Sequence, residues 1–148
     1  MNSRIELRSV EFEDMEALAL IEEEAFDPLW RHSASGLRAA FSQSLSFDVA
    51  LLEGRPVGFQ YSAQGIDAAT AHLARITVHP KVQGKGVGSA LMNRAVESYR
   101  RMHIRNVTLN TQLDNHASHR LYEKFGFRSI DSSIPLWVMP IKSPEEES

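Results

Sequence analysis

The sequence predicts one α/β domain in which a mixed β-sheet carries helices on both faces. Strand patterns come first and a strand, helix, strand, helix, strand order follows, which is typical of a mixed sheet. The 148 residues, 43% apolar and 24% charged, suit one compact domain with its own core. We assign residues 1–141 to this domain and residues 142–148, which include three glutamates, to a disordered tail.

The first half of the chain shows the patterns of strands and two helices. Apolar residues alternate with polar ones from Ile5, and they then recur at helical spacing until Pro28 ends the first helix. A turn at Gly54 separates two alternating runs, as in an antiparallel hairpin. In order, we expect a strand at Ile5 and Leu7, helices over Asp14–Phe26 and Ala34–Leu45, and strands over Phe47–Leu52, Pro56–Ala63 and Thr70–Val78.

The second half alternates helices and strands. Asn115 is a good N-cap for one of these helices, and Gly126 stands where a left-handed C-terminal cap belongs. In order, we expect a helix from Val87 to Met102, a strand over Val107–Asn110, a helix over Ala117–Phe125, and closing strands over Phe127–Ile130 and Leu136–Met139.

The composition excludes several classes of chemistry. Because there is no cysteine, disulfides, thiolate metal sites and a cysteine-bound acyl intermediate are excluded. Histidines and carboxylates do not fall at metal-ligand spacing, so we expect no metal. No stretch approaches the roughly 20 apolar residues that span a bilayer, and the N-terminus lacks a basic segment followed by an apolar run. We therefore expect a cytoplasmic protein, a monomer or homodimer, without membrane or nucleic-acid partners.

The net charge of −3 hides an uneven distribution of charged residues. Between Glu11 and Asp27 there are eight acids and no Lys or Arg, whereas between Arg75 and Arg128 ten bases outnumber three acids. The second region therefore favours an anion nearby, and the first favours a cation. The alternative is that both regions are ordinary solvated helix faces.

A glycine-rich turn stands between the strand that ends at Val78 and the helix that starts at Val87. Its residues Gln83 to Gly88 include glycines at positions 84, 86 and 88, which let the backbone approach a ligand closely. Exposed amides and the helix dipole at such a turn attract phosphate. The spacing fits neither a Walker loop nor a dinucleotide fingerprint, which leaves an anion-binding turn or a plain helix cap.

Two segments resemble the signatures of the GNAT N-acetyltransferases. Val78–Gly88 resembles their acyl-CoA signature, a V-x-P turn followed by [QR]-x-x-G-x-[GA], and Asn115–Phe127 resembles their second signature, N-x-x-[AS]-x-x-L-Y-x-x-x-G-F. The resemblance runs from Thr70 to Ile130. It implies the GNAT fold, a mixed and mostly antiparallel sheet of six to seven strands flanked by about four helices. It also implies direct transfer of an acetyl group from acetyl-CoA to a primary amine in a ternary complex.

The resemblance also implies how acetyl-CoA is held. Backbone groups of the strand around Ile76 and Val78 would pair with the pantetheine arm, as an added strand does. Asn115 and Ser118 would reach the pantetheine from the helix of the second signature, with a purely structural helix cap as the alternative for Asn115. The pyrophosphate would be bound by the amides of Gln83, Gly84, Lys85, Gly86, Val87 and Gly88.

Acetyl transfer needs a base for the amine and an acid for the departing thiolate. By resemblance Tyr122 is the acid, with a half-buried core tyrosine as the alternative. His72 stands where many related enzymes carry a glutamate base, with an exposed histidine at the end of a strand as the alternative. Strict alternation would place it on the same side of its strand as Ile76 and Val78. Glu22 and water are rival bases, although an acid at the edge of a helical stripe is usually solvated.

The acceptor amine is left open. Residues 24–30 resemble the first helix and loop of the branch that acetylates protein N-termini, including ribosomal-protein alanine acetyltransferases. In that branch Glu22, Phe26, Leu29 and Trp30 would line the acceptor cleft, although Trp30 could simply cover the core. Because residues 132–137 lack the branch's tyrosine-rich connection, a small-molecule amine, a protein N-terminus and a lysine all stay open. The alternatives to an enzyme are a non-catalytic acyl-CoA-binding regulator and a nucleotide-binding module.

Overall fold

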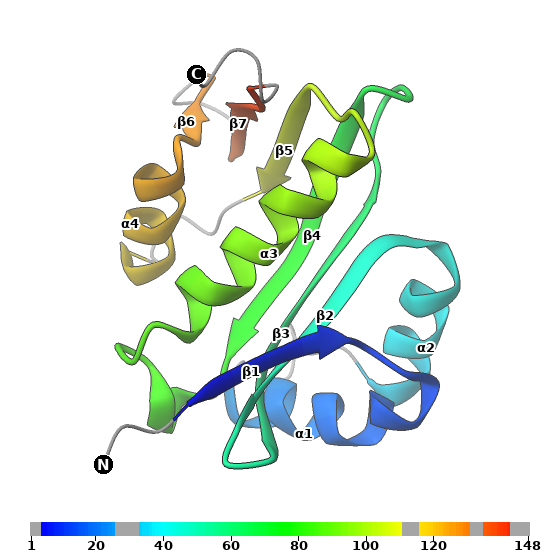
Figure 1. The fold of residues 1–148 in the computed structure, drawn as a ribbon, viewed down its shortest axis with the longest axis vertical. Helices are drawn as coiled ribbons and strands as arrows, with labels where there is room; N and C mark the ends of the chain where they lie inside the picture. Colours follow the sequence, from blue (N-terminus) through cyan, green and yellow to red (C-terminus); the bar gives the residue numbers. More distant parts are fainter. Residues whose placement is uncertain (1–3, 26–32, 111–115, 131–134, 143–148) are drawn as a thin grey trace.

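The computed structural model describes residues 4–25, 33–110, 116–130 and 135–142 (Figure 1). The strands are β1 (Ile5–Ser9), β2 (Ser44–Leu52), β3 (Arg55–Gln64), β4 (Thr70–Val78), β5 (Asn106–Asn110), β6 (Arg128–Ser129) and β7 (Leu136–Pro140). The α-helices are α1 (Met15–Ala25), α2 (Ala34–Gln43), α3 (Val87–Arg101) and α4 (His116–Phe125). Two short 3-10 helices are η1 (Phe12–Asp14) and η3 (Pro80–Val82).

The strands form one seven-stranded sheet in the order β1-β2-β3-β4-β5-β7-β6. Neighbouring strands run antiparallel except β4 and β5, which run parallel. The fold class predicted from the sequence, a mixed and mostly antiparallel sheet of six to seven strands with about four helices, is therefore confirmed.

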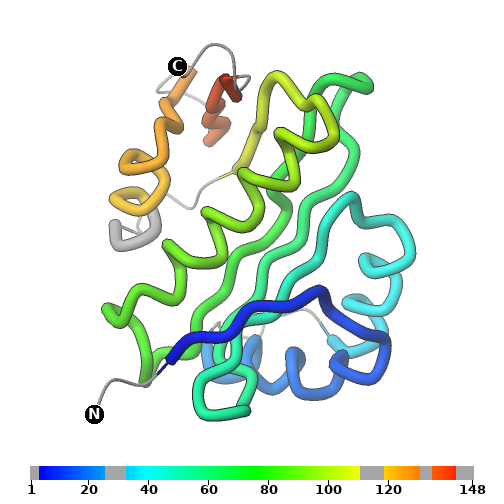
Figure 2. Tube along the Cα trace, in the orientation of Figure 1, coloured from blue at the N-terminus to red at the C-terminus, as the bar shows by residue number. Residues whose placement is uncertain are grey.

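The helices cover both faces of the sheet, as predicted. On one face, β2 and β3 pack against α1 and α2 in a core that includes Met15, Leu18, Leu37, Phe47 and Phe59. On the other face, α3 lies across the strands, and Figures 1 and 2 show it running along the sheet beside α4. The core beneath these two helices includes Leu73, Met92, Tyr99, Val107 and Phe127. The sheet therefore separates two apolar cores, and each can position a different part of a site.

A buried polar network ties α3 to the middle of the sheet. Arg94 Nε on α3 donates to Asp48 Oδ1 at 2.8 Å, and Gln60 Nε2 donates to Asp48 Oδ2 at 2.7 Å. Further along the helix the Tyr99 hydroxyl lies 2.5 Å from Ser62 Oγ, and burial raises the pKa of this phenol. These partners leave the buried carboxylate and phenol satisfied, so the network fixes the direction of α3 and hence the place of its N-terminus.

The clearest difference from the predicted borders lies at the start of β2. The helix predicted to reach Leu45 ends at Gln43, and β2 begins at Ser44 because this residue already pairs with Ala63 of β3. At the other end of the chain, β6 comprises only Arg128–Ser129 of the predicted strand over residues 127–130.

A β-bulge in β4 overturns the predicted alternation of its side chains. Arg75 pairs with Tyr61 and Leu73 pairs with Ser62, so Ala74 is an extra residue between them. Ala74 packs against the core under α1 and α2, whereas Ile76 packs against the core under α3. An extra residue shifts the two-residue period, so His72 does not share a face with Ile76 and Val78 as strict alternation predicted.

Candidate active site

Strands β4 and β5 separate after a short stretch of pairing. β5 pairs with β4 only from Thr70 to His72, whereas β3 pairs with β4 all the way to Val78. Figure 1 shows β5 ending while β4 runs on toward the start of α3. Among the described residues, no strand pairs with the β5-facing edge of β4 from Leu73 to Val78. This free edge is about 17 Å long at the usual rise per residue. An extended molecule can hydrogen-bond to such an edge as an added strand does.

The glycine-rich turn stands at the end of this free edge. Gly84 and Gly86 adopt left-handed φ angles of 84° and 87°, and Gly86 is the N-cap of α3. A Cβ atom added at either glycine would meet nothing within 4 Å, so the turn is open on that side. The first amides of α3 have no acceptor within the helix, and together with the helix dipole they favour a diphosphate. The amide of Lys85 differs, because it donates to Val82 O at 3.3 Å.

Close packing holds this turn in place. A Cβ at Gly58 of β3 would stand 2.8 Å from Thr77 O and 3.0 Å from Val87 Cγ1, so only glycine lets α3 approach the sheet this closely. On its other side, a Cβ at Gly88 would stand 3.1 Å from Leu121 Cδ2 of α4. The start of α3 is therefore wedged between β3, β4 and α4, which places the turn firmly beside the free edge.

His72 lies at the opposite end of the free edge, where β4 and β5 part. Its Nδ1 is 2.8 Å from Thr108 Oγ1 of β5, and burial lowers the pKa of its half-buried imidazole. This lowered pKa favours the neutral form of the ring, which can accept a proton. The sequence pointed to His72 as a candidate base but gave no sign of its contact with Thr108, which stands 36 residues away.

Tyr122 lies on α4, over the face of the sheet that α3 covers. Its ring centroid is 5.9 Å from that of Phe127 and 6.4 Å from that of Trp137, both at edge-to-face angles. Tyr122 is partly buried against the core on this side. Such packing is expected both for a core tyrosine and for an acid that is held in a fixed position. Asn115 lies outside the described residues, and so does the side chain of Ser118.

Glu22 is not at a solvated edge of α1, so that interpretation is wrong. Its side chain is 0% exposed and accepts two hydrogen bonds from Arg75, from Nε at 2.8 Å and from Nη2 at 2.5 Å. Thr77 Oγ1 donates a third at 3.2 Å. The acid that interrupts the apolar stripe of α1 thus meets a basic residue at the bulge of β4. The other predicted acceptor residues, Phe26, Leu29 and Trp30, lie outside the described residues.

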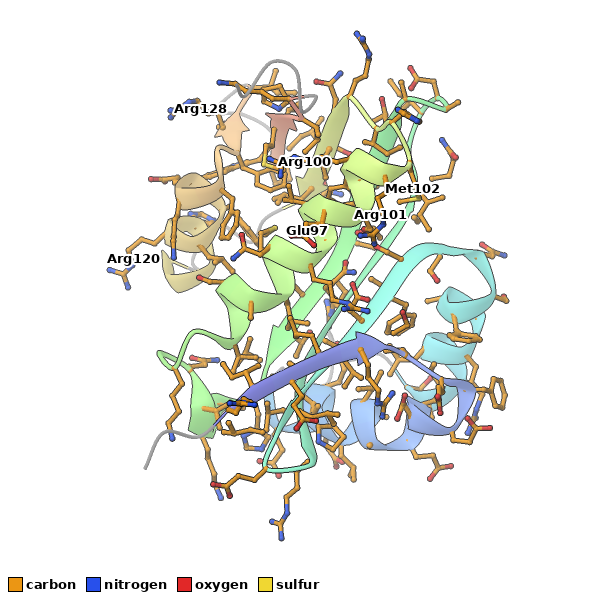
Figure 3. The ribbon with its side chains drawn as sticks, viewed as in Figure 1. Glu97, Arg100, Arg101, Met102, Arg120 and Arg128 are labelled. Atoms are coloured by element: carbon orange, nitrogen blue, oxygen red, sulfur yellow. The ribbon has the colours of Figure 1, made fainter. Side chains whose placement is uncertain are left out.

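The basic residues between Arg75 and Arg128 are divided between the interior and the surface. Arg75 and Arg94 are paired with Glu22 and Asp48. The exposed bases on α3, α4 and β6 include Arg101, Arg120 and Arg128, which Figure 3 shows together with Arg100 and Glu97. Only some of the bases in this part of the sequence are therefore exposed at the surface, where they could attract an anion.

In the described part of the chain, no helix is long and apolar enough to cross a membrane. Within the same residues, no three histidine or acidic side chains gather as a group that could hold a metal ion.

Known proteins share both the sequence pattern and the fold. N-acetylaspartate synthetase from Danio rerio is 36% identical over 84 residues, which are 57% of this chain and 30% of that protein. An uncharacterized N-acetyltransferase from Methanocaldococcus jannaschii is 30% identical over 101 residues, 65% of this chain and 44% of that protein. The chain thus spans less than half the length of these relatives.

Solved structures agree with the fold over nearly the whole chain. PaiA N-acetyltransferase from Thermoplasma acidophilum, solved in complex with coenzyme A, has a TM-score of 0.80 at 21% identity and covers 93% of this chain and 99% of its own. The ribosomal-protein-S18-alanine N-acetyltransferase from Escherichia coli has a TM-score of 0.81 at 20% identity and covers 98% and 99%. The model of the acetyltransferase (GNAT) family matches residues 12–127, and the chain therefore belongs to the GNAT acetyltransferase family.

Proposed function

We propose that this protein transfers the acetyl group of acetyl-CoA directly to a primary amine. The observation that carries the proposal is the free edge of β4, which has a glycine-rich helix N-terminus at one end and a half-buried histidine at the other. An extended pantetheine arm fits the edge, and its diphosphate fits the turn. The reacting end of the arm then lies toward His72, where an amine can attack.

The residues that would hold acetyl-CoA are those of the free edge and the turn. Backbone groups of Ile76 and Val78 would pair with the pantetheine, and amides between Gln83 and Gly88 would bind the diphosphate. Lys85 would contribute its side chain more than its amide, because that amide already donates to Val82. Asn115 and Ser118 are assigned to the pantetheine by family resemblance.

In the transfer, a C–N bond to the acetyl carbon forms and the C–S bond breaks. His72 takes the ammonium proton that the acceptor loses before attack, and Tyr122 gives its hydroxyl proton to the thiolate. The second proton that the nitrogen loses returns Tyr122 to its neutral form. Because the chain has no cysteine, the acetyl group goes to the amine without a cysteine-bound intermediate. Glu22 is the weaker candidate base, since both of its oxygens already accept hydrogen bonds from Arg75.

The test of the proposal is release of the CoA thiol from acetyl-CoA in the presence of a panel of amines. The panel includes free amino acids, with aspartate because of the N-acetylaspartate synthetases, peptides with free N-termini, and small polyamines. Saturable release with at least one amine supports an acetyltransferase. Binding of acetyl-CoA without turnover on any amine would identify a non-catalytic acyl-CoA-binding protein. Thermal stabilisation by ATP or NAD rather than by acetyl-CoA would identify a nucleotide-binding module.

Gly86→Asp is expected to weaken acetyl-CoA binding by about tenfold or more, because a carboxylate would enter the site of the diphosphate. Isothermal titration of acetyl-CoA measures the change. Gly54→Asp is the matched control, because Gly54 also has a positive φ and open space around it but lies in the β2–β3 turn. Equal affinity of the Gly86→Asp and Gly54→Asp variants would place the diphosphate elsewhere.

Tyr122→Phe is expected to lower kcat by about tenfold, as loss of a positioned acid does, while the affinity for acetyl-CoA stays near that of the parent protein. The edge-to-face contacts of the ring with Phe127 and Trp137 do not need the hydroxyl, so the fold is retained. Steady-state kinetics with a reactive amine measure the effect. An unchanged kcat would leave Tyr122 with a packing role only.

A further inference from the structure

The His72–Thr108 contact stands at the last pair of residues before β4 and β5 separate. We propose that Thr108 is a positioning residue for acetyl transfer, accepting a hydrogen bond from Nδ1–H of His72 and so keeping the lone pair of Nε2 free for the acceptor amine. This inference rests on the proposed function, in which His72 is the base.

The geometry favours this role because the two side chains are direct neighbours across parallel strands. The register pairs His72 with Thr108, and adjacent residues of a pair point to the same face of a sheet. Thr108 therefore points away from the core that its neighbours Val107 and Leu109 enter beneath α3. Nδ1 lies 2.8 Å from Oγ1, and Nε2 has no hydrogen-bond partner among the described residues.

A hydroxyl can hold the ring through both protonation states of the base. In the neutral ring with hydrogen on Nδ1, and again in the imidazolium, Nδ1–H donates and the threonine oxygen accepts. The ring therefore does not have to turn when Nε2 gains the proton of the amine. A carboxylate at the same place would also orient the ring but would raise its pKa, whereas a neutral hydroxyl adds no charge.

Threonine is well suited to this task on a strand. Its branched Cβ restricts χ1, so the hydroxyl keeps one direction with little loss of side-chain entropy on folding. The other ring tautomer, with hydrogen on Nε2, would present a donor to the amine and could not take its proton. The direction of a single hydrogen bond thus decides whether His72 can act as a base.

The experiment compares Thr108→Val, Thr108→Ser and the parent protein by two readouts. Nitrogen-15 NMR of the neutral His72 ring reports which nitrogen carries hydrogen, and steady-state kinetics report kcat beside the affinity for acetyl-CoA. We expect Nδ1–H in the parent, a shift toward Nε2–H in Thr108→Val, and kcat about tenfold lower in that variant with unchanged acetyl-CoA affinity. Thr108→Ser should restore the tautomer and most of kcat. Thr70→Val, two residues before His72 on β4, is the control and should change neither.

The two readouts separate this inference from the proposed function. Nε2–H in the parent protein, or a Thr108→Val variant with an unchanged tautomer, would overturn the positioning role. If CoA thiol is released and kcat depends on His72 but not on the Thr108 hydroxyl, this inference alone fails. If no amine supports release, the proposed function fails, while the nitrogen spectra still decide which tautomer Thr108 selects.

Discussion

Glu22→Ala is expected to lower the free energy of unfolding by about 3–5 kcal/mol, because it removes the carboxylate that pairs with a largely buried guanidinium. The side chains of Glu22 and Arg75 are 0% and 15% exposed, so water cannot easily replace the lost partner. Thr77 loses its acceptor as well. Urea unfolding followed by circular dichroism measures the change, provided that the transition is two-state.

A matched control lies on the same helix. Glu16 also pairs with an arginine, Arg38, but at 3.4 Å and with its side chain 83% exposed. Glu16→Ala should therefore change the free energy of unfolding by no more than about 0.5 kcal/mol, as exposed pairs do. The double variant with Glu22→Leu and Arg75→Met should recover much of the loss, since neither buried charge is then left behind. A loss near that of Glu16→Ala would mean that the Glu22–Arg75 pair contributes little.

The Glu22–Arg75 pair also connects stability to the proposed reaction. Arg75 follows the extra residue of the bulge, and the bulge decides which face of β4 each later side chain occupies. By holding Arg75 against α1, Glu22 stabilises the strand where β4 leaves β5. We expect the folded molecules of the Glu22→Ala variant to retain acetyl-CoA binding at the turn, since that turn also rests on β3 and α4.

The helices, the strands and the glycine-rich turn could be predicted because their signals are local. Apolar periodicity predicts α3. The glycines at positions 84 and 86 indicate a backbone with positive φ, which other residues rarely adopt. The order of strands and helices then limits the fold to a mixed sheet with two covered faces. The family resemblance pointed to the same sheet on independent grounds, through motifs at the turn and in α4.

The bulge and the paired side chains could not be predicted because they depend on partners far away in the chain. Arg75 meets Glu22 across 53 residues, and the register of β3 against β4 sets the position of Ala74. Strict alternation fails at one inserted residue, and a single sequence gives no sign of where that residue lies. The one local hint of this pairing was Glu22 within the apolar stripe of α1, because an acid buried there must have a partner.

His72→Gln is expected to lower kcat/KM by about 100-fold near neutral pH, because glutamine keeps a polar side chain of similar length but cannot accept the proton of the amine. Affinity for acetyl-CoA should stay unchanged, since the turn proposed to bind the diphosphate lies at the other end of the free edge. His72→Glu should retain part of the rate, because a carboxylate is also a base. An equal loss in both variants would mean that His72 is needed for its shape and not as a base.

The pH profile supplies the sharper test, because the direction of each change is fixed by the pKa of His72. Burial lowers this pKa below its ordinary value of 6.5, so kcat/KM of the parent protein should fall only as the pH drops through a value below 6.5. In the same range the unfolded chain binds a proton that the folded protein does not, so His72 also lowers the free energy of unfolding as the pH falls.

In the His72→Glu variant, the fall of kcat/KM at acidic pH should move toward the ordinary carboxyl pKa of about 4.3. The loss of kcat/KM in His72→Gln, relative to the parent protein, should become smaller as the pH approaches the pKa of the acceptor amine. An amine that is already deprotonated no longer needs a base to remove its ammonium proton. A deficit that stays constant across the whole pH range would contradict this role for His72.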